Sequence, residues 1–232
     1  MTTRIAVVVP VYRNAATLRA LAGRLDAALD DPWTLRFVVD ACPDGSAADA
    51  LALAATDPRI RATVLHRNVG QHRAIATGLQ AEPDADVWVC LDGDLQDPPE
   101  VVPALVDALA QRRVAAVFAG RRGAYESRGR RLTGNVHRRA LAALTGLPPD
   151  AGAFLAMDAR VRDAVVRGVL ALGAPSVVVA AATSSLPLTS VPVRRDVRCG
   201  GTSAWTSSAR VRQSARTIFW AASHRLSISV TA

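Results

Sequence analysis

Continuous apolar segments of strand length alternate with segments of helical periodicity over the first half of the chain. The strand-like segments are Ile5 to Val11, Leu35 to Val39, Ala62 to His66, Val87 to Leu91 and Val114 to Ala119. Between the first two, leucines recur at the spacing of one helix face, at positions 18, 21, 25 and 29. Apolar runs without alternation are typical of parallel strands that are buried on both faces. The pattern therefore predicts an α/β fold, with a mostly parallel central sheet and helices on both faces.

The second half of the chain follows a different pattern. Segments 123 to 135 and 194 to 208 are rich in Gly, Ser, Thr and Arg and read as loops, while helical periodicity returns over Leu132 to Leu144, Ala159 to Leu172 and Ser207 to Leu226. No charged residue occurs from Gly168 to Val193, which is long enough to span a bilayer. Because this stretch contains three prolines, we expect a buried helix end, a loop and a strand instead.

The chain has 232 residues, and its formal net charge of +8 is unevenly distributed. Residues 1–100 carry 9 Arg against 14 acidic residues, whereas residues 101–232 carry 19 Arg against 6. All 28 basic residues are Arg, so a Schiff-base lysine and a Walker-type phosphate lysine are excluded. The second half is therefore expected to face an anion.

Polar and charged residues follow the predicted strands, where ligands bind in open parallel sheets. They are Tyr12, Arg13 and Asn14, then Asp40 and Asp44, then Arg67, Asn68 and Gly70, then Asp92 and Asp94, and finally Arg121 and Arg122. Acids and guanidinium groups at one edge indicate a phosphate-bearing ligand with a metal ion. Asp92 and Asp94 are the candidate ligands of a hard cation such as Mg²⁺ or Mn²⁺, because neighbouring carboxylates repel each other unless a cation neutralises them.

The segment from Asp92 to Glu100 resembles the Asp-x-Asp-x-Gln-Asp-Pro-Pro-Glu signature of family 2 glycosyltransferases, in the dolichyl- or polyprenyl-phosphate sugar synthase branch. The likeness continues over about residues 5 to 220, in the family's order. Its further motifs are Val8 to Tyr12, Val38 to Asp40 with Pro43 to Ser46, Arg67 to Gly78, Arg131 to Thr133, Pro148 to Gly152, and Gly201 to Trp205. The resemblance implies a GT-A fold, with a catalytic domain at 1–200 and a helical, amphipathic tail at 201–232. Residues 1–120 would form its nucleotide-sugar and metal-binding half, and 121–200 its acceptor half.

The same resemblance implies roles for individual residues. Asp92, Asp94 and Gln96 would bind Mg²⁺ or Mn²⁺, and Arg121 and Arg131 would bind phosphate groups. Asp92, Asp94, Arg121 and Arg131 are thus the expected catalytic residues. The expected substrate-binding residues are Pro10, Tyr12, Asp40, Asn68, Gly70, Asp92, Ser203 and Trp205. The implied reaction is inverting transfer of a sugar from a nucleotide-diphosphate sugar to an acceptor, a polyprenyl phosphate above all.

The acceptor-side turn departs from the family pattern. The family usually continues Gly-Asp-Phe-Arg, whereas this chain reads Gly152-Ala153-Phe154-Leu155. Both the acid and the base are replaced, which leaves Asp150 and Asp158 as remote candidates for a catalytic base. Two alternatives stay open for this reason. One is a soluble transferase that glycosylates a hydroxyl or amine of a small molecule or peptide, and the other is a binding-only relative with an altered acceptor site.

Other protein classes fit less well. A nicotinamide dehydrogenase would share the sheet, but the first turn contains no glycine. A nucleic-acid partner is not expected, because acids surround the predicted cleft and only ten aromatic residues are present. Three separated cysteines and no secretory signal favour the cytoplasm. The chain stops where many relatives enter two transmembrane helices, so we expect a soluble protein, with possible peripheral contact at the inner membrane surface through its basic tail.

Overall fold

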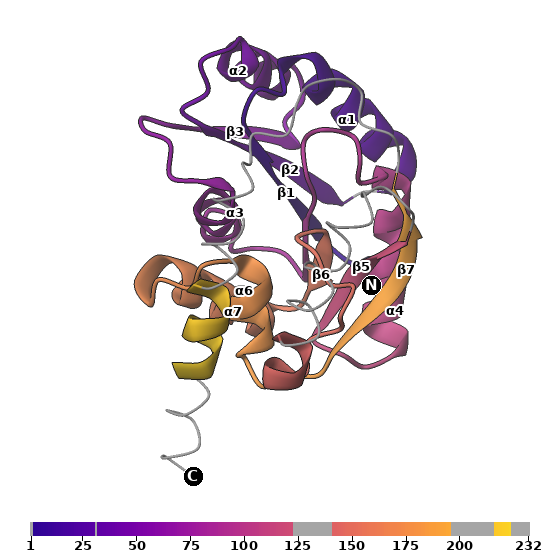
Figure 1. The fold of residues 1–232 in the computed structure, drawn as a ribbon. Coiled ribbons are helices and arrows are strands. Elements are labelled where there is room, and N and C mark those ends of the chain that lie inside the picture. Colours follow the sequence, from indigo (N-terminus) through magenta and orange to yellow (C-terminus); the bar gives the residue numbers. More distant parts are fainter. Residues whose placement is uncertain (1, 31, 123–140, 196–215, 224–232) are drawn as a thin grey trace.

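A seven-stranded sheet lies between two layers of helices (Figure 1). The structure is a computed structural model that describes residues 2–30, 32–122, 141–195 and 216–223. The strands are β1 (Ile5–Val11), β2 (Trp33–Asp40), β3 (Ile60–Leu65), β4 (Val87–Cys90), β5 (Ala116–Arg122), β6 (Leu155–Met157) and β7 (Leu188–Arg194). Their order across the sheet is β3-β2-β1-β4-β6-β5-β7. The expected α/β architecture is confirmed.

Helices cover both faces of this sheet (Figure 1). Their bounds are α1 (Ala15–Ala28), α2 (Ser46–Thr56), α3 (Gln71–Gln80), η1 (Pro99–Val101), α4 (Val102–Gln111), α6 (Ala159–Val166), η2 (Arg167–Ala171) and α7 (Val177–Ala182), with further helical turns at 141–145 and 216–223. Helices α1, α2 and α4 pack on one face with one hydrophobic cluster. Helices α3, α6 and α7 pack on the other face with a second cluster, which also takes in Ala221.

The uninterrupted apolar pattern of β1 supplies both clusters. Val7 and Val9 point into the α1 side, whereas Ala6 and Val8 point into the α3 side, and all four are buried. Successive side chains of a strand alternate between the two faces of its sheet. A strand that is covered on both faces therefore needs apolar residues at every position, as the sequence predicted.

The strand directions decide where a site can form. Strand β1 pairs in parallel with β2 and with β4, and β2 pairs in parallel with β3, so their carboxyl ends meet at one edge. We call this the ligand edge. Strand β6 is antiparallel to both of its neighbours, so it begins at the ligand edge, where Leu155 pairs with Cys90. Residues that follow β6 are consequently carried to the opposite edge.

Two expectations for the second half can now be compared with the structure. The uncharged stretch 168–193 contains the helix end and the strand that were predicted, as most of η2 and of β7, but also a helix that was not predicted, α7. Within the described ranges, no helix has the length and apolar character needed to cross a bilayer. In the segment 207–226, where helical periodicity was expected, Phe219 is 77% exposed. The turns at 216–223 instead bury Thr217 and Ala221 against the domain.

Gly78 provides a test of how tightly α3 packs on the sheet. A Cβ atom at this position would collide with Val8 and lie 2.7 Å from Val38 Cγ2, both in central strands. We expect Gly78→Ala to lower the free energy of unfolding by about 1–3 kcal/mol, because extra volume in a close-packed interior forces neighbours apart. Urea denaturation would measure the change.

The matched control is Gly23→Ala in the exposed face of α1, where the new methyl group meets nothing within 4 Å. This variant should gain about 0.5–1 kcal/mol from the better helix propensity of alanine. Equal effects of the two substitutions would contradict the close approach of α3 to β1 and β2.

Candidate functional site

The loop after β4 holds the carboxylates that the sequence singled out. It turns directly beneath the end of β1, because Gly93 lies so close that an added Cβ would be 3.4 Å from the Pro10 carbonyl oxygen. The Thr17 hydroxyl of α1 donates a 2.5 Å hydrogen bond to the Gly93 carbonyl oxygen. Leu95 adopts a φ of 60°, which is unusual for a residue other than glycine. The loop is therefore held in a constrained conformation at the ligand edge.

Asp97 fixes the base of this loop. Its side chain is 3% exposed, and its Oδ2 accepts a 3.2 Å hydrogen bond from the Asp92 backbone N–H. Its Oδ1 accepts from Arg195 Nε at 2.7 Å and lies 2.6 Å from Arg195 Nη2. Burial alone would lower the pKa of Arg195, but Asp97, Asp92 and Asp94 raise it above its ordinary value. The guanidinium is therefore charged, and it connects the end of β7 to the carboxylate loop.

Asp92 and Asp94 present the donor atoms for a cation. Asp92 Oδ1 accepts from Gln71 Nε2 at 2.6 Å, and its Oδ2 lies 3.5 Å from Arg195 Nη2. Asp94 Oδ1 accepts from the Gln96 backbone N–H at 3.1 Å, which keeps the Gln96 backbone close to this carboxylate. In the described ranges, no three His, Cys, Asp or Glu side chains converge as a ready-made metal cage. Two carboxylates nevertheless suit Mg²⁺ or Mn²⁺, which usually takes further ligands from phosphate and water.

Asp40 ends β2 and orders the loop that precedes α3. Its buried carboxylate accepts from the backbone N–H groups of Val69 at 2.7 Å and Gly70 at 2.8 Å. The Asn68 side-chain amide donates to the Asp40 carbonyl oxygen at 3.2 Å. Gly70 has a φ of 86°, in the region that favours glycine. Asp40, Asn68 and Gly70 thus lie together, as expected for one binding loop, and their contact with a nucleoside stays a prediction.

The turn after β1 supplies the other predicted contacts. Pro10 is buried within β1, and Tyr12 beyond it is 39% exposed, with the Arg13 guanidinium 5.5 Å from its ring centroid. Beside this turn, partial burial raises the pKa of Asp44, but hydrogen bonds from Cys42, Ser46 and Ala15 outweigh it and lower the pKa to about 2. Asp44 therefore stays ionised at neutral pH.

The two remote candidates for a catalytic base lie at different edges. Asp150 covers Gly120 near the end of β5, with its Cγ 2.7 Å from where a Cβ of Gly120 would lie. Its Oδ1 is buried and has no hydrogen-bond partner among the residues that the structure describes. Asp158 follows the antiparallel strand β6 and caps α6 by accepting from Val161 N at 3.0 Å. Asp158 is therefore at the wrong edge of the sheet for catalysis.

Of the remaining predicted site residues, the structure describes Arg121 but not Arg131, Ser203 or Trp205. Arg121 lies within β5 rather than after it, and its backbone is in register with Val193 of β7. Arg131, Ser203 and Trp205 fall in 123–140 and 196–215, outside the described residues. Their roles stay predictions.

Three contributors were not singled out from the sequence, namely Arg195, Asp97 and Gln71. Asp97 and Gln71 stand inside the quoted motifs, but the motifs gave them no role. Arg195 directly follows β7, and a position just after a strand is the same signal that marked Asp40 and Asp92.

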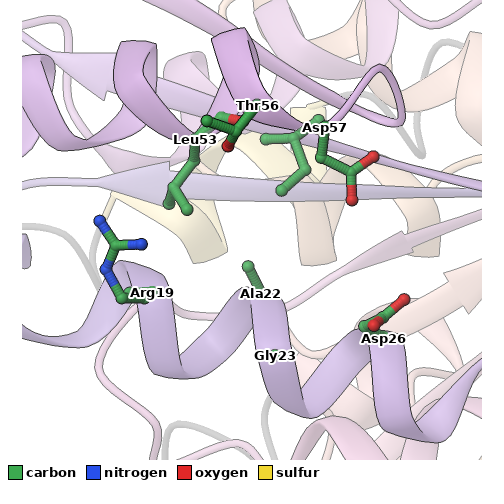
Figure 2. A pocket seen from close by; sticks show the side chains of 8 residues that line it. Arg19, Ala22, Gly23, Asp26, Leu53, Thr56 and Asp57 are labelled. Atoms are coloured by element: carbon green, nitrogen blue, oxygen red, sulfur yellow. The ribbon is translucent and has the colours of Figure 1, made fainter.

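A surface hollow of about 190 Å³ lies away from this edge, between α1 and α2 (Figure 2). Arg19, Ala22 and Asp26 of α1 face Leu53 and Thr56 of α2 across it. Its two carboxylates, Asp26 and Asp57, are each 2.8 Å from Arg59 Nη2. The hollow thus offers a neutralised ion cluster rather than a set of groups free for chemistry.

Comparison with solved structures supports the fold assignment. A glucosyl-3-phosphoglycerate synthase from Mycobacterium tuberculosis, in complex with Mn²⁺, uridine diphosphate and phosphoglyceric acid, has a TM-score of 0.65 at 20% identity, over 96% of this chain and 78% of that one. The mannosyltransferase PcManGT from Pyrobaculum calidifontis, in complex with GDP-Man and Mn²⁺, has a TM-score of 0.58 at 20% identity, over 86% and 58% of the two chains. The fold is that of the GT-A glycosyltransferases.

The family follows from the sequence comparison. The glycosyl transferase family 2 profile matches residues 6–155, so the chain belongs to that family. Similar curated proteins include undecaprenyl-phosphate 4-deoxy-4-formamido-L-arabinose transferases. The one from Pectobacterium carotovorum subsp. carotovorum is 44% identical over 112 residues, which is 46% of this chain and 34% of that protein. The one from Aeromonas hydrophila subsp. hydrophila is 38% identical over 113 residues, with the same shares. The match thus spans about a third of these relatives, and they belong to the branch that the motifs indicated.

Asp40→Asn tests whether this carboxylate organises the ligand edge. An asparagine offers one acceptor oxygen where the carboxylate serves two N–H groups, so one partly buried donor loses its partner. We expect the free energy of unfolding to fall by about 1–3 kcal/mol, as measured by urea denaturation. Asp30→Asn, on the exposed segment after α1, should stay within about 0.5 kcal/mol of the parent. If Asp40→Asn unfolds with the same free energy as the parent, the Asp40 carboxylate does not organise the ligand edge.

Proposed function

We propose that the protein is a metal-dependent, inverting glycosyltransferase that moves a sugar from a nucleotide-diphosphate sugar to a polyprenyl phosphate. Membership of glycosyl transferase family 2 and the names of the curated relatives support this proposal. The observation that carries it is the ligand edge itself. There, Asp92 and Asp94 lie beside Gln71, Gln96 and the charged Arg195, at the carboxyl ends of parallel strands. This edge is where open α/β sheets bind their ligands.

The donor would lie across the ends of β1, β2 and β4. Tyr12 and the Asp40 loop flank the place for the nucleoside, and Asp92 and Asp94, with Gln96, would hold Mg²⁺ or Mn²⁺ against the diphosphate. Arg121 and Arg131, both expected to bind phosphate, come from the acceptor half. This division follows the charge of the chain, since carboxylates retain a cation and guanidinium groups retain anions.

The reaction replaces one bond to the sugar with another. An acceptor oxygen forms a bond to the anomeric carbon while the bond from that carbon to the donor diphosphate breaks, and the diphosphate leaves with the bonding electrons. A bound divalent ion would stabilise the charge that gathers on the diphosphate. Arginine side chains fixed at the edge would add to this stabilisation. A phosphate acceptor is already an anion, so it needs no catalytic base.

The proposed acceptor places the protein at a membrane surface. Nucleotide sugars are cytoplasmic, and a polyprenyl phosphate is anchored in a bilayer. We therefore propose a cytoplasmic protein with peripheral contact at the inner membrane surface. The exposed Phe219 and Arg216 of the turns at 216–223 are suited to such a contact, because an apolar ring inserts among lipids and a guanidinium pairs with anionic headgroups.

Asp94→Asn tests the reaction and its metal together. With a nucleotide sugar, Mn²⁺ and a polyprenyl phosphate in anionic vesicles, we expect the parent to form a glycosylated lipid. Asp94→Asn should lower kcat/KM by about 10²–10³-fold, because a key ligand of the ion is lost where charge develops. Chromatography of radiolabelled product would measure both rates.

The control for this experiment is Asp84→Asn, an exposed carboxylate that lies before β4 at the opposite edge. It should keep the parent rate. Near-parent turnover of Asp94→Asn would refute the metal assignment. Nucleotide binding without any turnover would instead identify the binding-only alternative.

A second function is favoured by one observation. Asp150 lies near the end of β5, and within the described ranges its buried Oδ1 has no hydrogen-bond partner. Such a group would serve an acceptor hydroxyl or amine, which must lose a proton as it attacks. The alternative is therefore a transferase that glycosylates a small molecule or a peptide.

Asp150→Asn separates the two functions. If the acceptor is a hydroxyl, the substitution should lower kcat by about 10²–10⁴-fold, because the base is lost. If the acceptor is a phosphate, kcat should change by no more than about threefold. Parallel assays with a polyprenyl phosphate and with a panel of alcohols would give the answer. A large loss with the phosphate acceptor would contradict the mechanism proposed above.

A further inference from the structure

The contact between Arg195 and the carboxylate loop brings a positive charge to the place where a cation is expected. The Arg195 side chain is 17% exposed, and its two contacts with Asp97 are 2.6 and 2.7 Å long. The same Nη2 lies 3.5 Å from Asp92 Oδ2. Arg195 thus faces a structural carboxylate and a candidate metal ligand at the same time.

The charges of these groups balance in a specific way. Asp92, Asp94 and Asp97 carry three negative charges, and Arg195 returns one positive charge, which leaves two negative charges among the four groups. Asp97 is 3% exposed and is committed to Arg195 and to the Asp92 backbone. The two charges that remain are those of Asp92 and Asp94, which match one divalent ion.

A purely structural clamp would not need the second contact. Asp97 and Arg195 form a complete ion pair without Asp92, and a buried pair of charges is expensive to desolvate. The approach to Asp92 adds repulsion between the guanidinium and any cation that binds there. It also adds attraction for any anion that arrives with the cation, since guanidinium groups bind phosphates readily. The Arg195 side chain therefore weakens the binding of a cation and strengthens the binding of an anion at the same place.

We propose that Arg195 is a positioning residue that makes the divalent ion and the anionic donor bind together. Its charge weakens the binding of the free ion at Asp92 and Asp94, and it strengthens the binding of a nucleoside diphosphate. The ion is then retained chiefly when the diphosphate completes its ligands. This inference rests on the proposed donor site.

Arg195→Gln tests the proposal through two binding measurements on the full chain. Isothermal titration with Mn²⁺ alone should show about tenfold tighter binding, because a repelling charge a few ångströms away is removed. Titration with UDP and with GDP, without metal, should show about tenfold weaker binding for whichever nucleotide the parent prefers. Both differences should shrink in 0.5 M KCl, because salt screens charges in a partly exposed site.

Two further variants separate charge from geometry. Arg195→Lys keeps the charge and should stay within about threefold of the parent for Mn²⁺. Asp97→Asn removes a negative charge and frees Arg195 to face Asp92, so it should weaken Mn²⁺ binding by several-fold. Arg194→Gln is the matched control, because this exposed neighbour carries the same charge and should alter both affinities by less than about twofold. Circular dichroism would verify that each variant is folded.

The outcomes discriminate between the proposals. Tighter Mn²⁺ binding together with weaker nucleotide binding in Arg195→Gln supports the inference. Weaker binding of both ligands, or Arg195→Lys behaving like Arg195→Gln, overturns it in favour of a structural clamp and leaves the donor site intact. If Arg195→Gln does not fold, stronger Mn²⁺ binding by Asp97→Asn overturns the inference and weaker binding supports it. A parent that binds neither Mn²⁺ nor nucleotide overturns the proposed function and this inference together.

Discussion

A buried carboxylate, Asp97, joins the two halves of the chain. It accepts the backbone N–H of Asp92 in the acidic first half and the guanidinium of Arg195 in the basic second half, 98 residues further on. Each half alone would leave this group short of partners, and an uncompensated buried charge destabilises a fold by several kcal/mol. The position of the carboxylate loop therefore depends on the correct pairing of β7, the outermost strand of the sheet, with β5.

Buried ion pairs and unfavourable backbone angles both occur in the loops that flank the sheet. At the opposite edge, Glu82 is 4% exposed and pairs with Arg36 of β2 and Arg61 of β3, so this buried charge is compensated. Positive φ angles, which are unfavourable for residues with a Cβ atom, occur at Arg13, Ala41 and Leu95 at the ligand edge and also at Arg113 and Ser185, before β5 and β7. Strain of this kind persists only where the surrounding structure fixes it. The two hydrophobic layers that cover the strands provide that support.

The sequence predicted the fold far better than the details of the site. The apolar runs located β1 to β5 within a few residues, because doubly covered strands leave an unmistakable pattern. The antiparallel strand β6 has three residues, too few for any periodicity, and its direction decides that Asp150 and Asp158 lie at opposite edges. The hydrogen-bond partners of Asp40 and Asp97 could not be predicted from the sequence either. Long-range contacts of single side chains depend on the packing of elements that the local sequence does not encode.

The position of Leu155 in strand β6 explains why this chain departs from the family pattern there. Leu155, which replaces a basic residue of the family pattern, is fully buried and pairs with Cys90 and Phe118 in the sheet. Ala153 is likewise 8% exposed. A charge at position 155 would have to be desolvated here, so this chain uses the position for packing. Polar groups close to this buried segment are instead found before it, where Asp150 covers Gly120 of β5.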